Sequence, residues 1–193
     1  MQSAVESFFD ALASNWDDWA NDDLSFVRSL LLQVGITQGL HVLDVACGTG
    51  VIDRLLLDLT GEDVDAIDIS SNMIAKAKAK YANEPRAHFS QDDFLRFKGG
   101  SYDFIVIYNA YPHFTDPEAL RDALVSHLGK GGRFAIVHSL GRERLNHHHE
   151  GISRDISRDL LPVAEEARTF SPAFDIDVLS EGEDHYLIAG TRK

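Results

Sequence analysis

Two hydrophobic periods alternate along this chain, and together they predict strands that are separated by helices. The stretch from His41 to Ala46 is largely apolar apart from Asp44, which is typical of a parallel strand covered on both faces. A glycine-rich turn follows at 47–50, and the apolar stripe of a helix comes next, formed by Ile52, Leu55, Leu56 and Leu59. Because a strand, a glycine turn and a helix in this order aim free N–H groups at an anionic group, the segment predicts a site for a nucleotide-like cofactor.

The same two patterns continue to the end of the chain. Strands are expected at 63–69, 86–92, 102–110 and 133–139, and helices over 8–16, from Ser70 or Ser71 to about Tyr81, from Thr115 or Asp116 onward, and from about Arg142. Two last strands, 174–178 and 186–190, are separated by a short polar turn at 181–184 and predict an antiparallel hairpin.

The glycine turn and the elements around it resemble those of one family. The segment Asp44-Val45-Ala46-Cys47-Gly48-Thr49-Gly50 resembles the D-x-x-x-G-x-G motif of class I S-adenosylmethionine-dependent methyltransferases. The start of the strand at 102–107 resembles the family's F-D-x-V, and the residues at 129–132 resemble its L-K-P-G-G turn. This resemblance covers roughly residues 8–192. It implies an α/β, doubly wound fold, with a seven-stranded, mostly parallel sheet that ends in a C-terminal antiparallel hairpin.

The resemblance also implies the cofactor, S-adenosyl-L-methionine, and the residues that bind it. Asp68 lies near the ~20-residue offset at which an acidic side chain meets ribose hydroxyls. Asp92 occupies the position of the acidic residue that accepts from the adenine amino group in the family. The expected cofactor-binding set is Asp44, Ala46, Cys47, Gly48, Thr49, Gly50, Asp68, Ile69, Met73, Asp92, Asp93, Phe94, Asn109 and Ala110.

The net charge and the hydropathy of the chain limit the classes of partner that it can bind. The formal net charge is −13 at pH 7, which argues against nucleic acid, because its binding relies on Lys and Arg neutralising phosphates. The most concentrated basic run, Lys76, Lys78 and Lys80, is expected on the solvated face of a helix. No apolar run approaches the ~20 residues of a membrane span. A small-molecule acceptor is therefore favoured, with neither a nucleic-acid nor a membrane partner.

The chain's 193 residues, 44% of them hydrophobic, suit one compact domain. Within it we expect an N-terminal helical lid at 1–35, a cofactor-binding core at 36–139, a substrate-side helical insertion at 140–170 and the terminal hairpin at 171–193. The single cysteine, Cys47, is expected to be structural and cannot form an internal disulfide, and no signal peptide is recognised, which favours the cytoplasm. A monomer or a homodimer is expected.

Three histidines are candidates for acceptor chemistry. His113 follows one expected strand and His138 ends the next, so both are expected at the strand ends where ligands of open α/β sheets bind. The residues His138, Ser139, Arg142, Asn146 and His149 resemble an H-S-x-x-R-x-x-x-N-x-x-H stretch of small bacterial and archaeal methyltransferases. Three interpretations stay open for His113, His138 and His149: polar residues without a chemical role, a general base, or the ligands of a divalent metal.

Trp16 and Trp19 are candidates for a lid over the cofactor, because many relatives use this segment in that way. The leading hypothesis is methyl transfer to a small acceptor such as a thiol, a phenol or a metal-bound nucleophile. A non-catalytic subunit or sensor that binds S-adenosylmethionine is the alternative. A nicotinamide-dependent oxidoreductase is disfavoured, since the dinucleotide fingerprint needs a glycine or an alanine where Asp53 stands.

Overall fold

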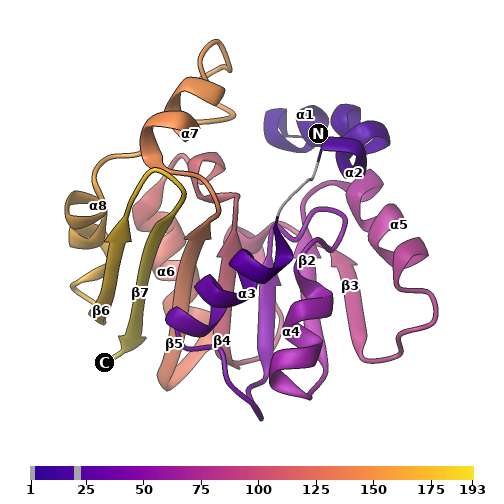
Figure 1. Cartoon of the computed structure of the whole chain (residues 1–193), viewed down its shortest axis with the longest axis horizontal. Coiled ribbons are helices and arrows are strands. Elements are labelled where there is room, and N and C mark those ends of the chain that lie inside the picture. Colours follow the sequence, from indigo (N-terminus) through magenta and orange to yellow (C-terminus); the bar gives the residue numbers. More distant parts are fainter. Residues whose placement is uncertain (1–2, 20–22) are drawn as a thin grey trace.

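A computed structural model describes residues 3–19 and 23–193. Its centre is a seven-stranded sheet in the order β3-β2-β1-β4-β5-β7-β6, as Figure 1 shows. The strands are β1 (Val42–Val45), β2 (Val64–Asp68), β3 (Ala87–Gln91), β4 (Tyr102–Tyr108), β5 (Leu128–His138), β6 (Phe174–Glu181) and β7 (Tyr186–Arg192). Six strands run in one direction and β7 alone runs opposite to them, so the fold class expected from the sequence is confirmed.

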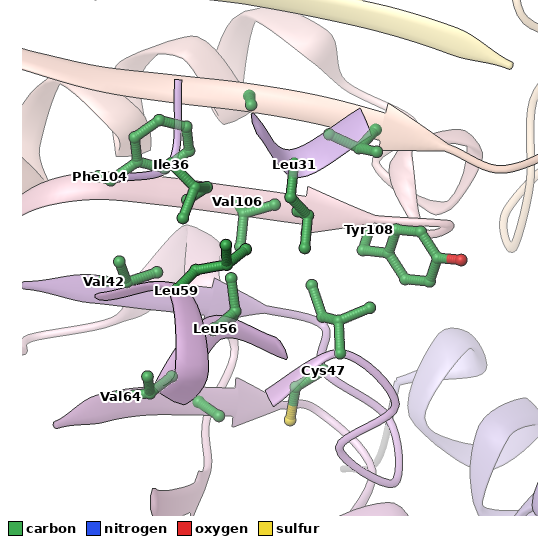
Figure 2. Packing of buried hydrophobic residues seen from close by; sticks show 14 of the residues in the cluster. Leu31, Ile36, Val42, Cys47, Leu56, Leu59, Val64, Phe104, Val106 and Tyr108 are labelled. Atoms are coloured by element: carbon green, nitrogen blue, oxygen red, sulfur yellow. The ribbon is translucent and has the colours of Figure 1, made fainter. Parts of the chain in front are cut away.

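Helices cover both faces of this sheet (Figure 1). One face packs against α3 (Leu24–Gln33), α4 (Asp53–Thr60) and α5 (Ser71–Lys80). The other face packs against α6 (Pro117–His127) and α8 (Val163–Phe170). Side chains of a strand alternate between faces, so Val42 enters the first core and Leu43 the second. Figure 2 shows the first core, where Val42, Val64 and Val106 of three neighbouring strands meet Leu56 and Leu59 of α4.

The remaining helices lie at the carboxyl edge of the parallel strands (Figure 1). At one side of that edge are α1 (Ala4–Leu12), a 3₁₀ turn (Ala13–Asn15) and α2 (Trp16–Trp19). At the other side is α7 (Arg142–His148), which follows β5 directly. None of the described helices is long and apolar enough to cross a membrane. Two helical segments, one early and one late in the sequence, therefore overhang the edge at which ligands of such sheets bind.

Some expected boundaries were wrong. The helix whose apolar stripe was expected from Ile52 begins at Asp53, because the glycine turn extends to the cap residue Ile52 before a helical ladder forms. The turn expected at 129–132 is part of β5, which begins at Leu128, pairs there with Tyr102, and then shifts register. Both differences arise at glycines, whose backbone adopts several conformations at little cost.

Local backbone geometry ends the two central strands. Ala46 has a φ of 58° and Asn109 a φ of 51°, and both values lie in the left-handed region. An extended ladder cannot continue through such a residue, so β1 ends at Val45 and β4 ends at Tyr108 rather than at Ala110. The chain therefore turns sharply at the strand ends that the sequence assigns to the cofactor.

Candidate active site

The glycine turn after β1 is hydrogen-bonded to Asp68, the last residue of β2. Gly48 and Gly50 have φ values of 57° and 77°, which favour glycine. The Gly48 N–H donates to Asp68 Oδ2 at 2.8 Å, and the Ser70 N–H donates to Asp68 Oδ1 at 2.8 Å. Burial raises the pKa of Asp68 to about 6, although both N–H donors act to lower it. Asp68 thus joins two neighbouring strand ends at the centre of the expected cofactor site.

A second pair of carboxyl groups lies beneath the turn. Asp44 of β1 and Asp53 of α4 are both fully buried, at 1% and 0% exposure, and none of their four carboxyl oxygens has a hydrogen-bond partner among the described residues. Burial, together with the charges of Asp53 and Asp68, raises the pKa of Asp44 well above its usual range. Burial also raises the pKa of Asp53 to about 7. Burial disfavours the charged form of both groups, so the raised pKa values favour protonated carboxyl groups at this place.

The N-terminal helices cover the glycine turn. A Cβ atom at Gly48 would lie 3.5 Å from Trp16 Nε1, so the indole stands directly over the turn. The Thr49 hydroxyl donates to Asp17 Oδ1 at 2.5 Å, and Lys80 Nζ donates to the same oxygen at 2.8 Å. Trp16 therefore lies where the lid was expected, whereas the side chain of Trp19 falls outside the described part of the chain.

The lysine run of α5 corrects one expectation. Lys80 bonds Asp17 and Thr49, and Lys76 Nζ donates to the Ser14 carbonyl at 2.6 Å. A purely solvated face was predicted, but two of the three lysines hold the N-terminal helices on α5. The sequence could not show this, since the partners lie about 60 residues away in the chain.

Two further hydrogen bonds hold the N-terminal helices against the start of α5. Asp10 Oδ1 accepts from the Ser70 hydroxyl at 2.6 Å and from the Asn72 N–H at 3.1 Å. Ser70 is the N-cap of α5, as expected. Because the Ser70 N–H also donates to Asp68, the N-terminal helices and the expected ribose-binding carboxylate share one partner.

Most other expected cofactor residues lie near these strand ends. The Asp92 N–H donates to the Asp68 carbonyl, and Met73 is buried at the start of α5 next to a half-buried Ile69. Asp93 caps a 3₁₀ turn (Phe94–Arg96) by accepting from the Leu95 N–H. Asp93 and the buried Phe94 therefore have structural contacts of their own.

Asn109 and Ala110 follow β4 at the centre of the edge. The Asn109 side chain bonds Ser139 twice, with Nδ2 donating to the hydroxyl at 3.1 Å and Oδ1 accepting from the backbone N–H at 3.1 Å. This pair of bonds ties the end of β4 to the end of β5. Ala110 is buried behind it.

Cys47 is structural, as its setting in the turn suggested. The thiol is 6% exposed and lies in the first core, as Figure 2 shows. Burial and the nearby carboxyl groups raise the pKa of Cys47 well above its usual range. A thiol that stays protonated is a poor nucleophile, because the thiolate is the reactive form.

His113 sits in a 3₁₀ turn (Tyr111–His113) that follows β4. Its Nδ1 lies 3.0 Å from the carbonyl oxygen of Ile156, which can only accept, so Nδ1 carries the hydrogen and Nε2 keeps a lone pair. Burial lowers the pKa of His113 to about 4, and the neighbouring His149 acts in the same direction. His113 is thus a neutral imidazole of defined tautomer.

His149 and His138 complete a group around it. The rings of His113 and His149 meet edge to face with centroids 5.2 Å apart. His138 has no exposed surface, and burial lowers its pKa to about 3, with His113 and His149 adding to the effect. We call His113, His138 and His149 the histidine group. His147 and His148, by contrast, are exposed.

The histidine group does not form a metal site. In the described part of the chain, no three His, Cys, Asp or Glu side chains are placed to hold a metal ion. The three imidazoles are therefore not arranged as metal ligands in this structure, and the two other interpretations, a general base and polar residues without a chemical role, stay open.

Contacts that the sequence did not indicate hold this group in place. Asn146 pins the chain at Leu160 with two bonds, its Nδ2 donating at 3.0 Å and its Oδ1 accepting at 2.8 Å. Arg158 donates to both carboxylate oxygens of the buried Glu166 at 2.6 and 3.1 Å, and its backbone N–H donates to the Pro112 carbonyl. Tyr111 donates to the same carboxylate at 2.7 Å. These bonds dock the segment around Ile156 onto His113.

Buried side-chain atoms that lack a hydrogen-bond partner gather at two places. Among the described residues they belong to the Asp44–Asp53 pair and to a second set formed by His138, Arg142, His149 and Ser157. Buried polar atoms without partners are rare in proteins and indicate where a ligand or water binds. Of these residues, Ser157 carried no sequence signal, and Asp53 was noted only as a departure from the dinucleotide fingerprint.

Comparison with known proteins gives concordant results. A family model described as a methyltransferase domain matches residues 42–132. The chain is 28% identical over 166 residues to a malonyl-[acyl-carrier protein] O-methyltransferase of Acetivibrio thermocellus, a match that covers 84% of this chain and 57% of the relative. The chain spans about half the length of the curated relatives it matches.

Two solved structures share the fold. A putative methyltransferase of Haloferax volcanii, in complex with the Trm112 methyltransferase activator, superposes with a TM-score of 0.83 at 20% identity, covering 98% of this chain and 97% of that one. The N-methyltransferase NodS of Bradyrhizobium japonicum, in complex with S-adenosyl-L-homocysteine, superposes with a TM-score of 0.75 at 15% identity, covering 97% and 98%.

Proposed function

Because the chain belongs to the class I S-adenosylmethionine-dependent methyltransferase superfamily, we propose that it catalyses methyl transfer from S-adenosyl-L-methionine to a small-molecule acceptor. When bound, this cofactor supplies a methyl group activated on a sulfonium. The chain's own residues must bind it, exclude water and accept any proton that the acceptor loses.

The residues at the glycine turn fit this cofactor. Gly48 leaves the backbone of the turn bare on the side that Trp16 covers, so a ligand that displaces the indole meets no side chain of the turn. Asp68 offers a carboxylate to ribose hydroxyls, and Asp92 lies beside it to bind the adenine amino group. The unpartnered carboxyl groups of Asp44 and Asp53 favour a cationic group nearby. Asn109 and Ala110 offer backbone carbonyls to the methionine amino group.

The observation that carries the catalytic proposal is the position of the histidine group beside the lid. Phe9 contacts Trp16 with ring centroids 5.8 Å apart and contacts His113 with centroids 4.8 Å apart. Since Trp16 covers Gly48, one aromatic ring links the cofactor turn to the histidines. We infer that the acceptor binds between them.

His113 is the proposed general base, with His138 and His149 beside it as proton acceptors. Its lowered pKa keeps it neutral at pH 7, and the Ile156 carbonyl leaves Nε2 free to accept a proton. Burial disfavours a positive charge here, so we propose that the acceptor enters as a neutral molecule whose anion stabilises the imidazolium once the proton has moved to His113. A thiol or a phenol has a proton of this kind, and the net charge of −13 disfavours nucleic acid.

Calorimetry tests the cofactor assignment. S-adenosylhomocysteine should bind and NAD should not, and Gly48→Val should abolish binding while the protein stays folded, since a branched side chain would fill the space under Trp16. Binding of NAD alone would assign the chain to the oxidoreductase alternative.

Measuring turnover distinguishes an active methyltransferase from a non-catalytic subunit that only binds the cofactor. Release of S-adenosylhomocysteine should be measured over a panel of thiols and phenols, with His113→Asn and the exposed His147→Asn compared on each acceptor. A loss of rate in His113→Asn alone supports the base. Cofactor binding without turnover on any acceptor would favour the non-catalytic alternative.

A further inference from the structure

Four side chains beside the proposed base have buried polar atoms without a hydrogen-bond partner. Among the described residues, these atoms are both ring nitrogens of His138, Nδ1 of His149, Nε of Arg142 and the hydroxyl of Ser157. His138 has no exposed surface, and Ser157 is 2% exposed. Since burying a polar group without a partner is costly, this place suits a polar group that comes from outside the chain.

Three segments of the chain bring these atoms toward His113. His138 ends β5, and His149 caps α7, where its ring meets that of His113. Ser157 directly follows Ile156, whose carbonyl oxygen lies 3.0 Å from His113 Nδ1. The Ser157 hydroxyl is therefore one residue away from the contact that fixes the tautomer of His113.

The unpartnered atoms of this group can donate where His113 can only accept. The Ser157 hydroxyl donates one hydrogen, and a neutral imidazole such as that of His138 donates one as well. Nε2 of His113, by contrast, keeps a lone pair. A ligand atom that gives up an acidic proton and then carries a negative charge matches this combination. Oxygen matches it better than sulfur, because sulfur accepts hydrogen bonds weakly.

From this geometry we propose that His138 and Ser157 bind the oxygen of the acceptor's reacting hydroxyl, and that the acceptor is a phenol or an enol. This inference rests on the proposed function for the methyl donor and for His113 as the base. An alkyl alcohol does not fit, because a neutral imidazole with a lowered pKa is too weak a base to ionise it.

The proposed step is balanced in atoms and electrons. The hydroxyl proton moves to His113 Nε2, and the oxygen, which accepts from Ser157 and His138, forms a bond to the methyl carbon. The bond between that carbon and the sulfonium sulfur breaks, and its electron pair stays on sulfur. The products are a methyl ether, S-adenosylhomocysteine and one proton, which His113 releases to solvent.

Other charged groups around the site affect where the negative charge is stabilised. Glu181 Oε2 lies 3.5 Å from Arg142 Nε, so this carboxylate already neutralises part of the charge of Arg142. The exposed side chains of His148 and Asp159 act on His149. His138 and Ser157 have no such charged partner among the described residues, and Ser157 is therefore the residue whose alteration tests the site most directly.

Para-nitrophenol is a suitable probe, because its phenolate absorbs visible light. In protein saturated with S-adenosylhomocysteine, we expect the bound probe to absorb as the phenolate at a pH at which the free probe is still neutral. The physical reason is that hydrogen bonds from Ser157 and His138 stabilise the anion, while His113 holds the proton. A spectroscopic titration over pH measures this shift without any turnover.

Variants assign the shift to the proposed site. Ser157→Ala should weaken binding of para-nitrophenol by about tenfold or more and return its ionisation toward that of the free probe. Binding of para-nitrothiophenol should change much less in the same variant, because its sulfur gains little from the hydroxyl. Stability in urea should be unchanged or higher, since the variant removes a hydroxyl without a partner. The control is Ser153→Ala, which alters an exposed serine of the same segment and should change neither affinity nor ionisation.

The inference and the proposed function fail by different results. A probe that does not bind or stays neutral when bound would overturn the inference, as would full affinity in Ser157→Ala. A loss of stability in Ser157→Ala would also overturn it, because the hydroxyl would then have a structural partner. Turnover of thiols alone would exclude the phenol assignment and leave the proposed function standing. If S-adenosylhomocysteine does not bind, the proposed function fails instead.

Discussion

The phenyl ring of Phe9 stands edge-on against the imidazole of His113, with ring centroids 4.8 Å apart and planes at 87°. Phe9 belongs to α1, and His113 follows β4 about a hundred residues later. Because the same phenyl ring contacts Trp16, the N-terminal helices cover the cofactor turn and shield the proposed base at once. Movement of these helices would therefore change the solvation of both places together.

Removing that ring should change the titration of His113. Burial lowers the pKa of His113 to about 4, so Phe9→Ala, which admits water, should move the pKa up toward the ordinary 6.5. The measurement is an NMR pH titration of the imidazole signals. Phe8→Ala removes the neighbouring ring of α1 and should leave the pKa of His113 low. An unchanged pKa in Phe9→Ala would show that the lid does not shield this imidazole.

Asp68→Ala should weaken binding of S-adenosylhomocysteine by about 1.5–3 kcal/mol, because charge-assisted hydrogen bonds to the ribose are lost. The change should also lower the free energy of unfolding by ~1–3 kcal/mol, since the Gly48 and Ser70 N–H groups lose their acceptor. Calorimetry and urea unfolding measure the two effects, with the exposed Asp63→Ala as the control. Full affinity in Asp68→Ala would remove this carboxylate from the site.

Buried neutral histidine should make the protein sensitive to acid. Burial lowers the pKa of His138 to about 3, so below pH 6.5 the unfolded chain binds a proton that the folded protein does not. This group's contribution to stability therefore falls as the pH falls from 6.5 toward 3, by up to ~1.4 kcal/mol per pH unit.

The raised pKa values of Asp53 and Asp68 act in the opposite direction, and their contribution is lost as the pH rises through about 6 to 7. The difference between the unaltered protein and His138→Gln cancels these carboxyl groups. Plotted against pH, that difference in unfolding free energy should slope only below 6.5, and the exposed His147→Gln should give none. A flat difference for His138→Gln would mean that His138 is not buried in its neutral form.

Glu166→Ala should be strongly destabilising. Arg158 and Tyr111 both donate to this buried carboxylate, and its removal leaves a guanidinium without its partner. A cost of about 3–5 kcal/mol in the free energy of unfolding is expected. Urea unfolding checks this, and the exposed neighbour Glu165→Ala should remain within about 0.5 kcal/mol of the unaltered protein. A small effect of Glu166→Ala would contradict the docking role assigned to the ion pair.

The sequence by itself determined the order and type of the elements around the glycine turn. The alternation of apolar runs and helical stripes is a local property, and so is the glycine-rich turn after β1, which is why the sheet and its terminal hairpin could be predicted. The motif resemblance identified Asp68 and the turn in the same way, since the motif lies within one strand–turn–helix–strand unit.

Only the tertiary structure decided which distant side chains meet. The burial of Asp44 and Asp53, the bonds from the lysines of α5 to the N-terminal helices and the Arg158–Glu166 pair all depend on how helices pack onto the sheet. The pKa values depend on the same packing, because burial, the largest cause of each shift at the site, exists only once the surrounding elements exclude water. Periodicity reports which face of an element is apolar, and it contains no information about the polar groups that another element brings against that face.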